Sequence, residues 1–110
     1  MNARDREGLR VLLEDAEIAL RHAAEYGAGW HRDTRTRDAV ALRVLQVGER
    51  AKKVSAAGLL AVPDVPWKRV KGMRDWIAHD YGRVDPTILE NVVSVHLPPL
   101  ISAVRRTLGG

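Results

Sequence analysis

Apolar residues recur at three- and four-residue steps along most of this chain, a spacing that predicts α-helices. A first helix is expected over about residues 4–26. Its recurring apolar positions are Leu9, Leu12, Leu13, Ala16, Leu20 and Ala23. Gly27 and Gly29 follow and are typical of a helix end. Residues 30–36 are polar and without period, which predicts a loop.

A second helix is predicted from an N-cap at Asp33, Thr34 or Thr36 to about Ala57, with Gly58 as the residue after its end. Its apolar stripe consists of Val40, Val44, Val47, Ala51 and Val54. Three further apolar residues widen this stripe, namely Ala41, Leu42 and Leu45. The widened surface exceeds what one neighbouring helix covers.

Prolines punctuate the second half of the chain. Residues 59–66 contain two prolines and are predicted to form a connector. Pro66 suits the first turn of a third helix that ends near His79 or Tyr81, before Gly82 breaks it. Asp85 and Pro86 are a capping residue and a first-turn proline, so they predict the start of a fourth helix.

The fourth helix is apolar over most of its circumference, and Pro98 and Pro99 are expected to kink or break it. No segment has the pattern of a strand. The economical fold is all-α, an antiparallel four-helix bundle forming one domain over residues 1–110. Surplus apolar surface on the second and fourth helices predicts a homodimer, unless a more compact core absorbs that surface.

Composition narrows the setting of this fold. The chain has no cysteine, which excludes disulfides and thiolate metal sites. Its N-terminus is charged and no later apolar run approaches the roughly 18 residues of a membrane span, so we expect a soluble, cytoplasmic protein. A formal charge of +4 favours a polyanionic partner.

Reactive side chains are concentrated in residues 74–81, which read RDWIAHDY. Arg74 offers a planar fork of donors for a phosphate, and His79 can move a proton near neutral pH. Tyr81 offers a modifiable hydroxyl. Cleavage of RNA without a metal needs a base for the 2′-hydroxyl, an acid for the leaving oxygen and positive charge on the transition state. The octapeptide therefore predicts RNA cleavage.

The five-residue spacing of Arg74 and His79 constrains that hypothesis. On a straight helix it separates two side chains by about 140°, so one protomer would aim them poorly at one phosphate. The spacing is better explained if His79 lies where the helix ends, or if two copies of the motif share a cleft across a dimer axis.

Four ordered runs carry a family resemblance: GERAKKV at 48–54, VPWKRVKGMRDWIAHDY at 65–81, VD at 84–85 and LP at 97–98. Together they resemble the HepT-like branch of the HEPN superfamily over about residues 37–104. This resemblance implies an all-helical dimeric ribonuclease. It also implies a toxin whose antitoxin is a minimal nucleotidyltransferase, in a complex of open stoichiometry.

The family pattern of Arg, four residues, His, any residue and Tyr falls on Arg74, His79 and Tyr81. Asp75 stands where the family commonly has asparagine. The expected product is a 2′,3′-cyclic phosphate, with His79 as base and its symmetry mate as the candidate acid. The resemblance further implies that the antitoxin transfers AMP to Tyr81, which would block the cleft by bulk and negative charge.

Other residues have supporting roles in this interpretation. Glu49 is either a buried partner of Arg74 or a polar residue at the dimer seam. Lys68, Arg69 and Lys71 are predicted to contact RNA, although each cation fits a solvated helix face equally well. The remaining histidines are scattered without metal-ligand spacing, so neither metal nor cofactor is expected, nor is DNA as substrate.

Purely structural interpretations remain for the motif residues. His79 has the position of a helix cap, Arg74 that of a structural ion pair with Glu49, Asp75 or Asp80, and Tyr81 that of a half-buried aromatic. Two other functions follow from them. One is a non-catalytic HEPN-like module that binds a nucleotidyltransferase, and the other is a plain dimeric interaction protein.

Overall fold

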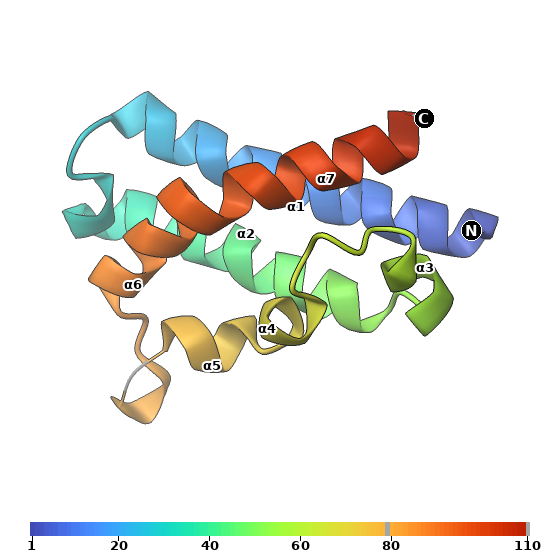
Figure 1. The fold of residues 1–110 in the computed structure, drawn as a ribbon. Coiled ribbons are helices and arrows are strands. Elements are labelled where there is room, and N and C mark those ends of the chain that lie inside the picture. The colour runs from blue at the N-terminus through green and yellow to red at the C-terminus, as the bar shows by residue number, and fades with distance from the viewer. Residues whose placement is uncertain (79, 110) are drawn as a thin grey trace.

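The fold is all-α in the computed structural model, which describes residues 1–78 and 80–109 and, of Asp80, the backbone alone. The long helical segments run in alternating directions (Figure 1), as expected for an antiparallel bundle. In chain order the elements are α1 (Ala3–Tyr26), η1 (Trp30–Arg32), α2 (Thr34–Lys52), α3 (Ala56–Leu60), α4 (Trp67–Lys71), α5 (Met73–Ile77), η2 (Asp80–Gly82), α6 (Pro86–Asn91), η3 (Val92–His96) and α7 (Leu97–Gly109).

Helix α1 has the predicted extent because both ends are satisfied locally. The side chain of Asn2 accepts a bond from the Asp5 N–H at 2.7 Å, and Gly27 ends the helix at φ 93°. Asp33, one of the three predicted caps, begins α2 by accepting from the Thr36 N–H at 3.0 Å. The predicted loop over residues 30–36 is wrong in part, since a 3₁₀ turn buries Trp30 there.

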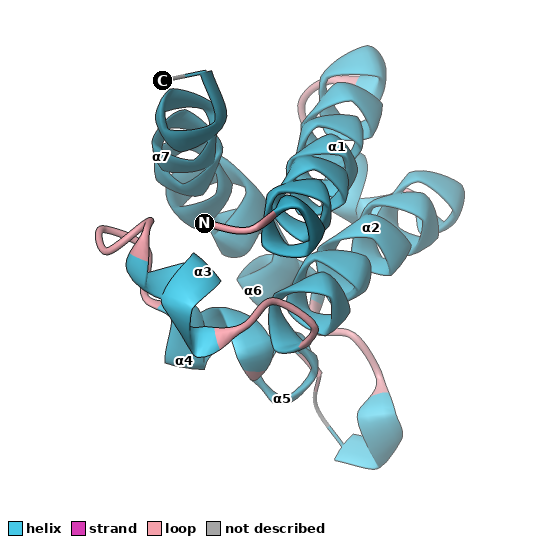
Figure 2. Ribbon diagram, turned by 90° about the vertical axis from the view of Figure 1, so that its right-hand side faces the viewer, coloured by secondary structure: helices cyan, strands magenta, loops and turns pink. Residues whose placement is uncertain are grey.

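One apolar core lies between α1, α2, α7 and the α4–α5 segment (Figure 2). The fully buried side chains in it include Leu9, Leu12, Val40, Val44, Val47, Met73, Ile77, Leu89, Leu97 and Val104. They come from every long helix and from α5, which explains why a chain of 110 residues closes around a single core.

The second helix ends five residues earlier than predicted, at Lys52 rather than Ala57. The buried Asp5 carboxylate accepts from the Ser55 N–H at 3.0 Å and from the Ser55 hydroxyl. Ser55 in turn caps α3, so the chain restarts there in a new direction. Gly58 is therefore not the residue after α2 but a buried position inside α3, against Asp5.

The third predicted helix is interrupted. It forms as α4 and α5, with Gly72 between them, and ends at Ile77 rather than near His79 or Tyr81. The connector before it spans residues 61–66 only, because α3 occupies its predicted start. The Trp67 indole N–H donates to the carbonyls of Leu59 at 3.0 Å and Val62 at 2.9 Å, which ties the connector to α4.

The fourth helix begins at the predicted Asp85 cap and continues from Pro86 to Gly109 without a break. A π-helical turn over Val92–His96 precedes Pro98 and Pro99, and the Leu97 N–H bonds to the Val92 carbonyl. Pro98 and Pro99 have no backbone N–H to donate to carbonyls one turn earlier. The wider turn therefore falls where helical hydrogen bonds are already missing. Of the kink or break expected at these prolines, the break does not occur, and the kink stays a prediction.

Most of the apolar surface of this helix belongs to the core. By length and composition the segment 86–109 would suffice to cross a membrane, yet its buried residues pack inside the protein, as in the core helix of a soluble protein. Leu42 and Val95 remain 56% and 54% exposed. The compact core thus absorbs much of the surplus that predicted a homodimer, and dimerisation stays a prediction.

Candidate functional site

The site region begins where α2 meets the α4–α5 segment, at Gly48. A Cβ at this position would lie 2.8 Å from the Met73 Cβ and 2.9 Å from the Val70 carbonyl oxygen. Only glycine allows the two backbones to approach so closely. This contact brings Glu49, the next residue of α2, opposite Arg74 on α5.

Glu49 and Arg74 form a long ion pair that is exposed to solvent. Arg74 Nη2 lies 3.6 Å from Glu49 Oε1, and Lys52 Nζ lies 3.5 Å from Oε2. The Arg74 and Glu49 side chains are 64% and 41% exposed. Glu49 is a partner of Arg74, as one alternative predicted, but it is not buried. Exposed pairs of this kind contribute little to stability, which leaves the Arg74 guanidinium accessible to another anion.

The octapeptide leaves the helix before its histidine. Helix α5 ends at Ile77, and Ala78 is extended with φ −98° and ψ 145°. Ala78 pairs with Val84 in an isolated antiparallel bridge, and the Asp85 N–H donates to the Ile77 carbonyl at 2.7 Å. These bonds close a loop between Ala78 and Val84 at the end of α5. His79 lies outside the described residues.

Tyr81 stands on this loop with its side chain fully exposed. Its backbone has φ 59° and ψ 26°, and Gly82 follows at φ 75°. A left-handed conformation is rare for a tyrosine and costs about 1–2 kcal/mol. The interpretation of Tyr81 as a half-buried core aromatic is therefore wrong, because no described residue covers its ring.

The predicted RNA-contacting cations share helix α4. Lys68 and Arg69 are exposed and Lys71 is half-buried. The Arg69 guanidinium lies 4.2 Å above the centre of the Trp76 ring, so it is held in a cation–π contact. Asp75 is exposed on α5, next to Arg74 in the chain. Among the described residues, no three His, Asp or Glu side chains gather as metal ligands would.

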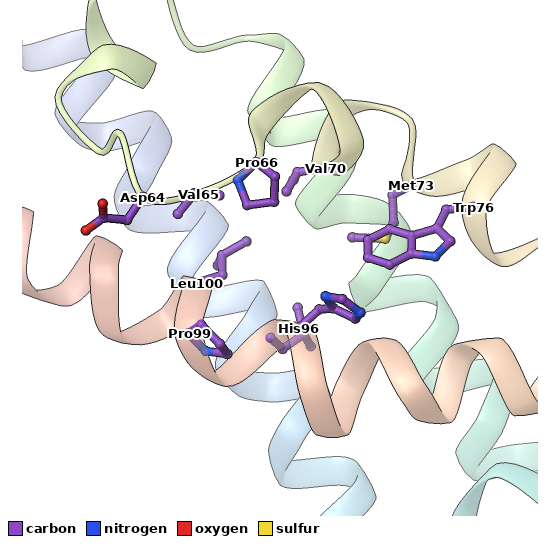
Figure 3. A pocket seen from close by; sticks show the side chains of 10 residues that line it. Asp64, Val65, Pro66, Val70, Met73, Trp76, His96, Pro99 and Leu100 are labelled. Carbon is purple, nitrogen blue, oxygen red and sulfur yellow. The ribbon is translucent and has the colours of Figure 1, made fainter.

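A feature that the sequence did not indicate lies on the other side of α5. Trp76 and His96 meet there, with ring centres 4.7 Å apart and planes at 70°. They line a pocket between the α4–α5 segment and the last helix (Figure 3). Nothing in the spacing could have revealed it, because the two side chains lie on separate helices that meet only in the fold.

The family model for HepT-like ribonucleases matches residues 12–107, nearly the whole chain. This match includes the first helix from residue 12 onward, which the motif resemblance did not reach, as well as the α2, α5 and loop residues described above. No solved structure matches this chain significantly. The helical fold and the order of the motifs agree in kind with an all-helical family. Because the family model matches nearly the whole chain, the chain belongs to the HepT-like ribonuclease family.

Proposed function

We propose that this protein is a metal-independent ribonuclease that cleaves RNA at the Arg74–His79 motif and acts as the toxin of a toxin–antitoxin pair. Family membership carries the proposal, since a ribonuclease family implies an RNA substrate. The position of Arg74 supports it. This guanidinium is more than half exposed, and among the described residues it pairs with Glu49 at 3.6 Å, so a phosphate can compete for it.

The chemistry assigned to the motif is a transesterification. His79 removes the proton from the 2′-hydroxyl, whose oxygen attacks the neighbouring phosphorus. The bond to the 5′-oxygen breaks, that oxygen takes a proton from an acid, and a 2′,3′-cyclic phosphate remains. Arg74 stabilises the extra negative charge of the transition state. Asp75 and Glu49 act as supporting charges that orient Arg74.

We assign the acid to a second copy of the motif. A composite cleft between two protomers supplies two histidines and two arginines to one phosphate, which the spacing within one chain does not. Exposure of Arg74 and Tyr81 leaves this face open to a partner. Exposed apolar side chains such as Leu42 and Val95 are candidates for the dimer contact.

Control of this activity is assigned to Tyr81. A cognate nucleotidyltransferase in the cytoplasm transfers AMP from ATP to its hydroxyl: the tyrosine oxygen loses its proton and bonds to the α-phosphorus, and pyrophosphate leaves. A negative phosphate then lies beside the cleft. The full exposure of the ring supports this assignment, because an enzyme must reach the hydroxyl to modify it. The left-handed backbone at Tyr81 turns the chain within the loop that Ala78 and Val84 close.

The test is cleavage of total RNA by purified protein in EDTA. Arg74→Ala is expected to lower the rate at least about 100-fold, the usual loss when a transition-state charge is removed. His79→Ala should be as severe. Arg83→Ala is the matched control, since it removes an exposed cation just outside the motif and is expected to keep the activity.

Two measurements make the result decisive. Sedimentation shows whether each variant keeps the oligomeric state of the wild type, and mass spectrometry shows whether Tyr81 carries AMP. Wild-type protein that is free of AMP yet inert towards RNA would contradict the ribonuclease proposal. Protein purified with its nucleotidyltransferase should carry AMP on the tyrosine, and Tyr81→Phe should stay unmodified and active.

A further inference from the structure

The pocket beside Trp76 has the size of part of a ligand. Its volume is about 90 Å³. Whole small-molecule ligands usually occupy about 300–1,000 Å³, so only one flat ring of a larger molecule fits here. The walls are mostly apolar and come from the connector, from α4 and α5, and from the last helix (Figure 3); they include Val65, Pro66, Val70, Met73, Pro99 and Leu100.

Aromatic rings form one end of this pocket. Trp76 is only partly buried, and its ring and that of His96 meet with their planes at 70°. Arg69 lies 4.2 Å from the centre of the same indole ring. Arg69 thus covers one face of a partly buried indole, and proteins use aromatic rings and guanidinium groups together to hold single-stranded nucleic acid, with a base on a ring and the phosphate on a cation.

The charged side chains around the pocket are also placed as a base and its phosphate would require. The Asp64 carboxylate lies at the end of the pocket opposite Trp76 (Figure 3). It would repel a phosphate, although Arg106 lies 3.8 Å away and offsets part of its charge. The α4 cations Lys68 and Arg69 lie at the exposed surface, with Arg69 next to the indole. A neutral ring therefore suits the pocket, while its phosphate suits α4 outside.

We infer that this pocket receives one unpaired nucleobase of the RNA substrate, stacked on Trp76, with Arg69 on the adjoining phosphate. The inference rests on the proposed ribonuclease function and adds a specificity subsite to it. Trp76 and Arg74 are two residues apart on α5, so they point about 160° apart around the helix. The base that is read therefore lies across α5 from the cleaved phosphate.

The test uses the indole N–H signals of the three tryptophans in an NMR spectrum. The Trp76 signal is assigned from Trp76→Phe. The ligands are a four-nucleotide 2′-O-methyl RNA, which cannot be cleaved because the attacking hydroxyl is blocked, and an abasic strand with the same phosphates. The Trp76 signal is expected to shift with the first strand and not with the second, while the buried Trp30 stays unchanged.

Variants test the energetic share of each group. Trp76→Leu keeps an apolar side chain but removes the stacking surface, and it should weaken binding of the 2′-O-methyl strand roughly tenfold. Arg69→Gln should weaken it more than Lys68→Gln, because both remove one exposed charge but only Arg69 lies on the indole. Equal losses for the two cations would contradict the subsite.

The inference and the proposed function fail separately. If the protein cleaves RNA but Trp76 does not respond, or responds equally to the abasic strand, the base subsite is wrong and Trp76 only packs the fold. If RNA is not cleaved but Trp76 responds to bases alone, the subsite stands without the nuclease. Because the spectrum is recorded on the wild type, a misfolded variant cannot decide the outcome.

Discussion

The α1–α2 pair and the α4–α5 segment differ in the length of their helices and in the closeness of their ion pairs. Helices α1 and α2 have 24 and 19 residues and pack along their length (Figure 1). Between them the buried Asp15 carboxylate pairs with Arg43 at 2.8 Å and Arg50 at 3.1 Å. Helices α4 and α5 have five residues each, and the ion pair from Arg74 to Glu49 on α2 is open at 3.6 Å.

The long helices form the stable framework, and the short α4–α5 segment carries candidate site residues such as Arg74. An isolated five-residue helix is not stable in water, so α4 and α5 depend on the burial of Val70, Met73 and Ile77 against the core. The Arg74 and Tyr81 side chains project from that framework towards solvent. Exposed charges of this kind contribute little to stability, so changes to them should alter activity more than folding.

The largest effect is expected in the scaffold. Leu12 is fully buried in α1, and Leu12→Ala should lower the free energy of unfolding by about 2–5 kcal/mol through lost contacts and a cavity. Chemical denaturation measures it. Leu60→Ala makes the same change at a side chain that is 76% exposed and should cost far less. Similar losses for both would remove the distinction between core and surface.

The next effect tests the junction between the two regions. Alanine in place of glycine within a helix normally stabilises by about 1 kcal/mol. Gly48→Ala should instead destabilise by about 1–3 kcal/mol, because the new Cβ meets Met73 and the Val70 carbonyl. The α4–α5 segment should shift, and RNA cleavage should fall even where the protein remains folded.

Gly109→Ala is the control for that junction, since a Cβ at Gly109 meets nothing within 4 Å. Thermal unfolding and cleavage assays on both variants give the comparison. A Gly48→Ala protein as stable and as active as the Gly109→Ala protein would show that α2 and α5 tolerate a wider separation than the close backbone contact indicates.

A smaller effect compares two turns. Gly27 after α1 and Gly82 after Tyr81 have φ 93° and 75°, and a Cβ at either meets nothing within 4 Å. Alanine should therefore cost about 1–2 kcal/mol at each site through backbone strain alone. Thermal unfolding measures that cost. Only Gly82→Ala should also slow modification of Tyr81; an equal change in the Gly27→Ala protein would argue against a local role of the loop.

The smallest effect at neutral pH concerns the protonation of the Asp5 carboxylate. Hydrogen bonds from the Ser55 hydroxyl and N–H hold the pKa of Asp5 below its ordinary value of 3.8. Its folded-state pKa is depressed, so its contribution to stability is complete above about pH 4 and is lost as the pH falls through the folded pKa. Asp5→Asn should lower the melting temperature at pH 7.

The difference in melting temperature between wild type and Asp5→Asn should then shrink on acidification below about pH 4. The matched control is Asp38→Asn, which changes an exposed carboxylate on α2 and should leave the melting temperature nearly unchanged at every pH. A gap between wild type and Asp5→Asn that is constant from about pH 7 to about pH 3 would contradict the bonds from Ser55 as its cause.

Local patterns predicted the elements that have local causes. The extent of α1 and the caps at Asp33 and Asp85 follow from side chains that bond to backbone within three residues. The end of α2 could not be predicted in this way, because it depends on Asp5, fifty residues from Ser55. In the last helix a kink or break was expected at two prolines, and the chain instead continues without a break through a π-helical turn.

The candidate site divides along the same line. The order of Arg74, Asp75 and Tyr81 in one motif, with Glu49 in another, was readable from sequence, and all four lie within the residues that the family model matches. The pairing of Arg74 with an exposed Glu49 was one alternative among several until the fold placed α2 beside α5. Full exposure of Tyr81 and the Trp76–His96 pocket had no signal in the spacing.

By itself the sequence determined the helical class, the first helix, two helix caps and the motif that identifies the family, because each depends on neighbours along the chain. Only the tertiary structure decided where α2 ends, how closely α5 approaches it and which rings meet across the pocket. Those outcomes depend on contacts between residues far apart in sequence, such as Asp5 with Ser55 and Trp76 with His96.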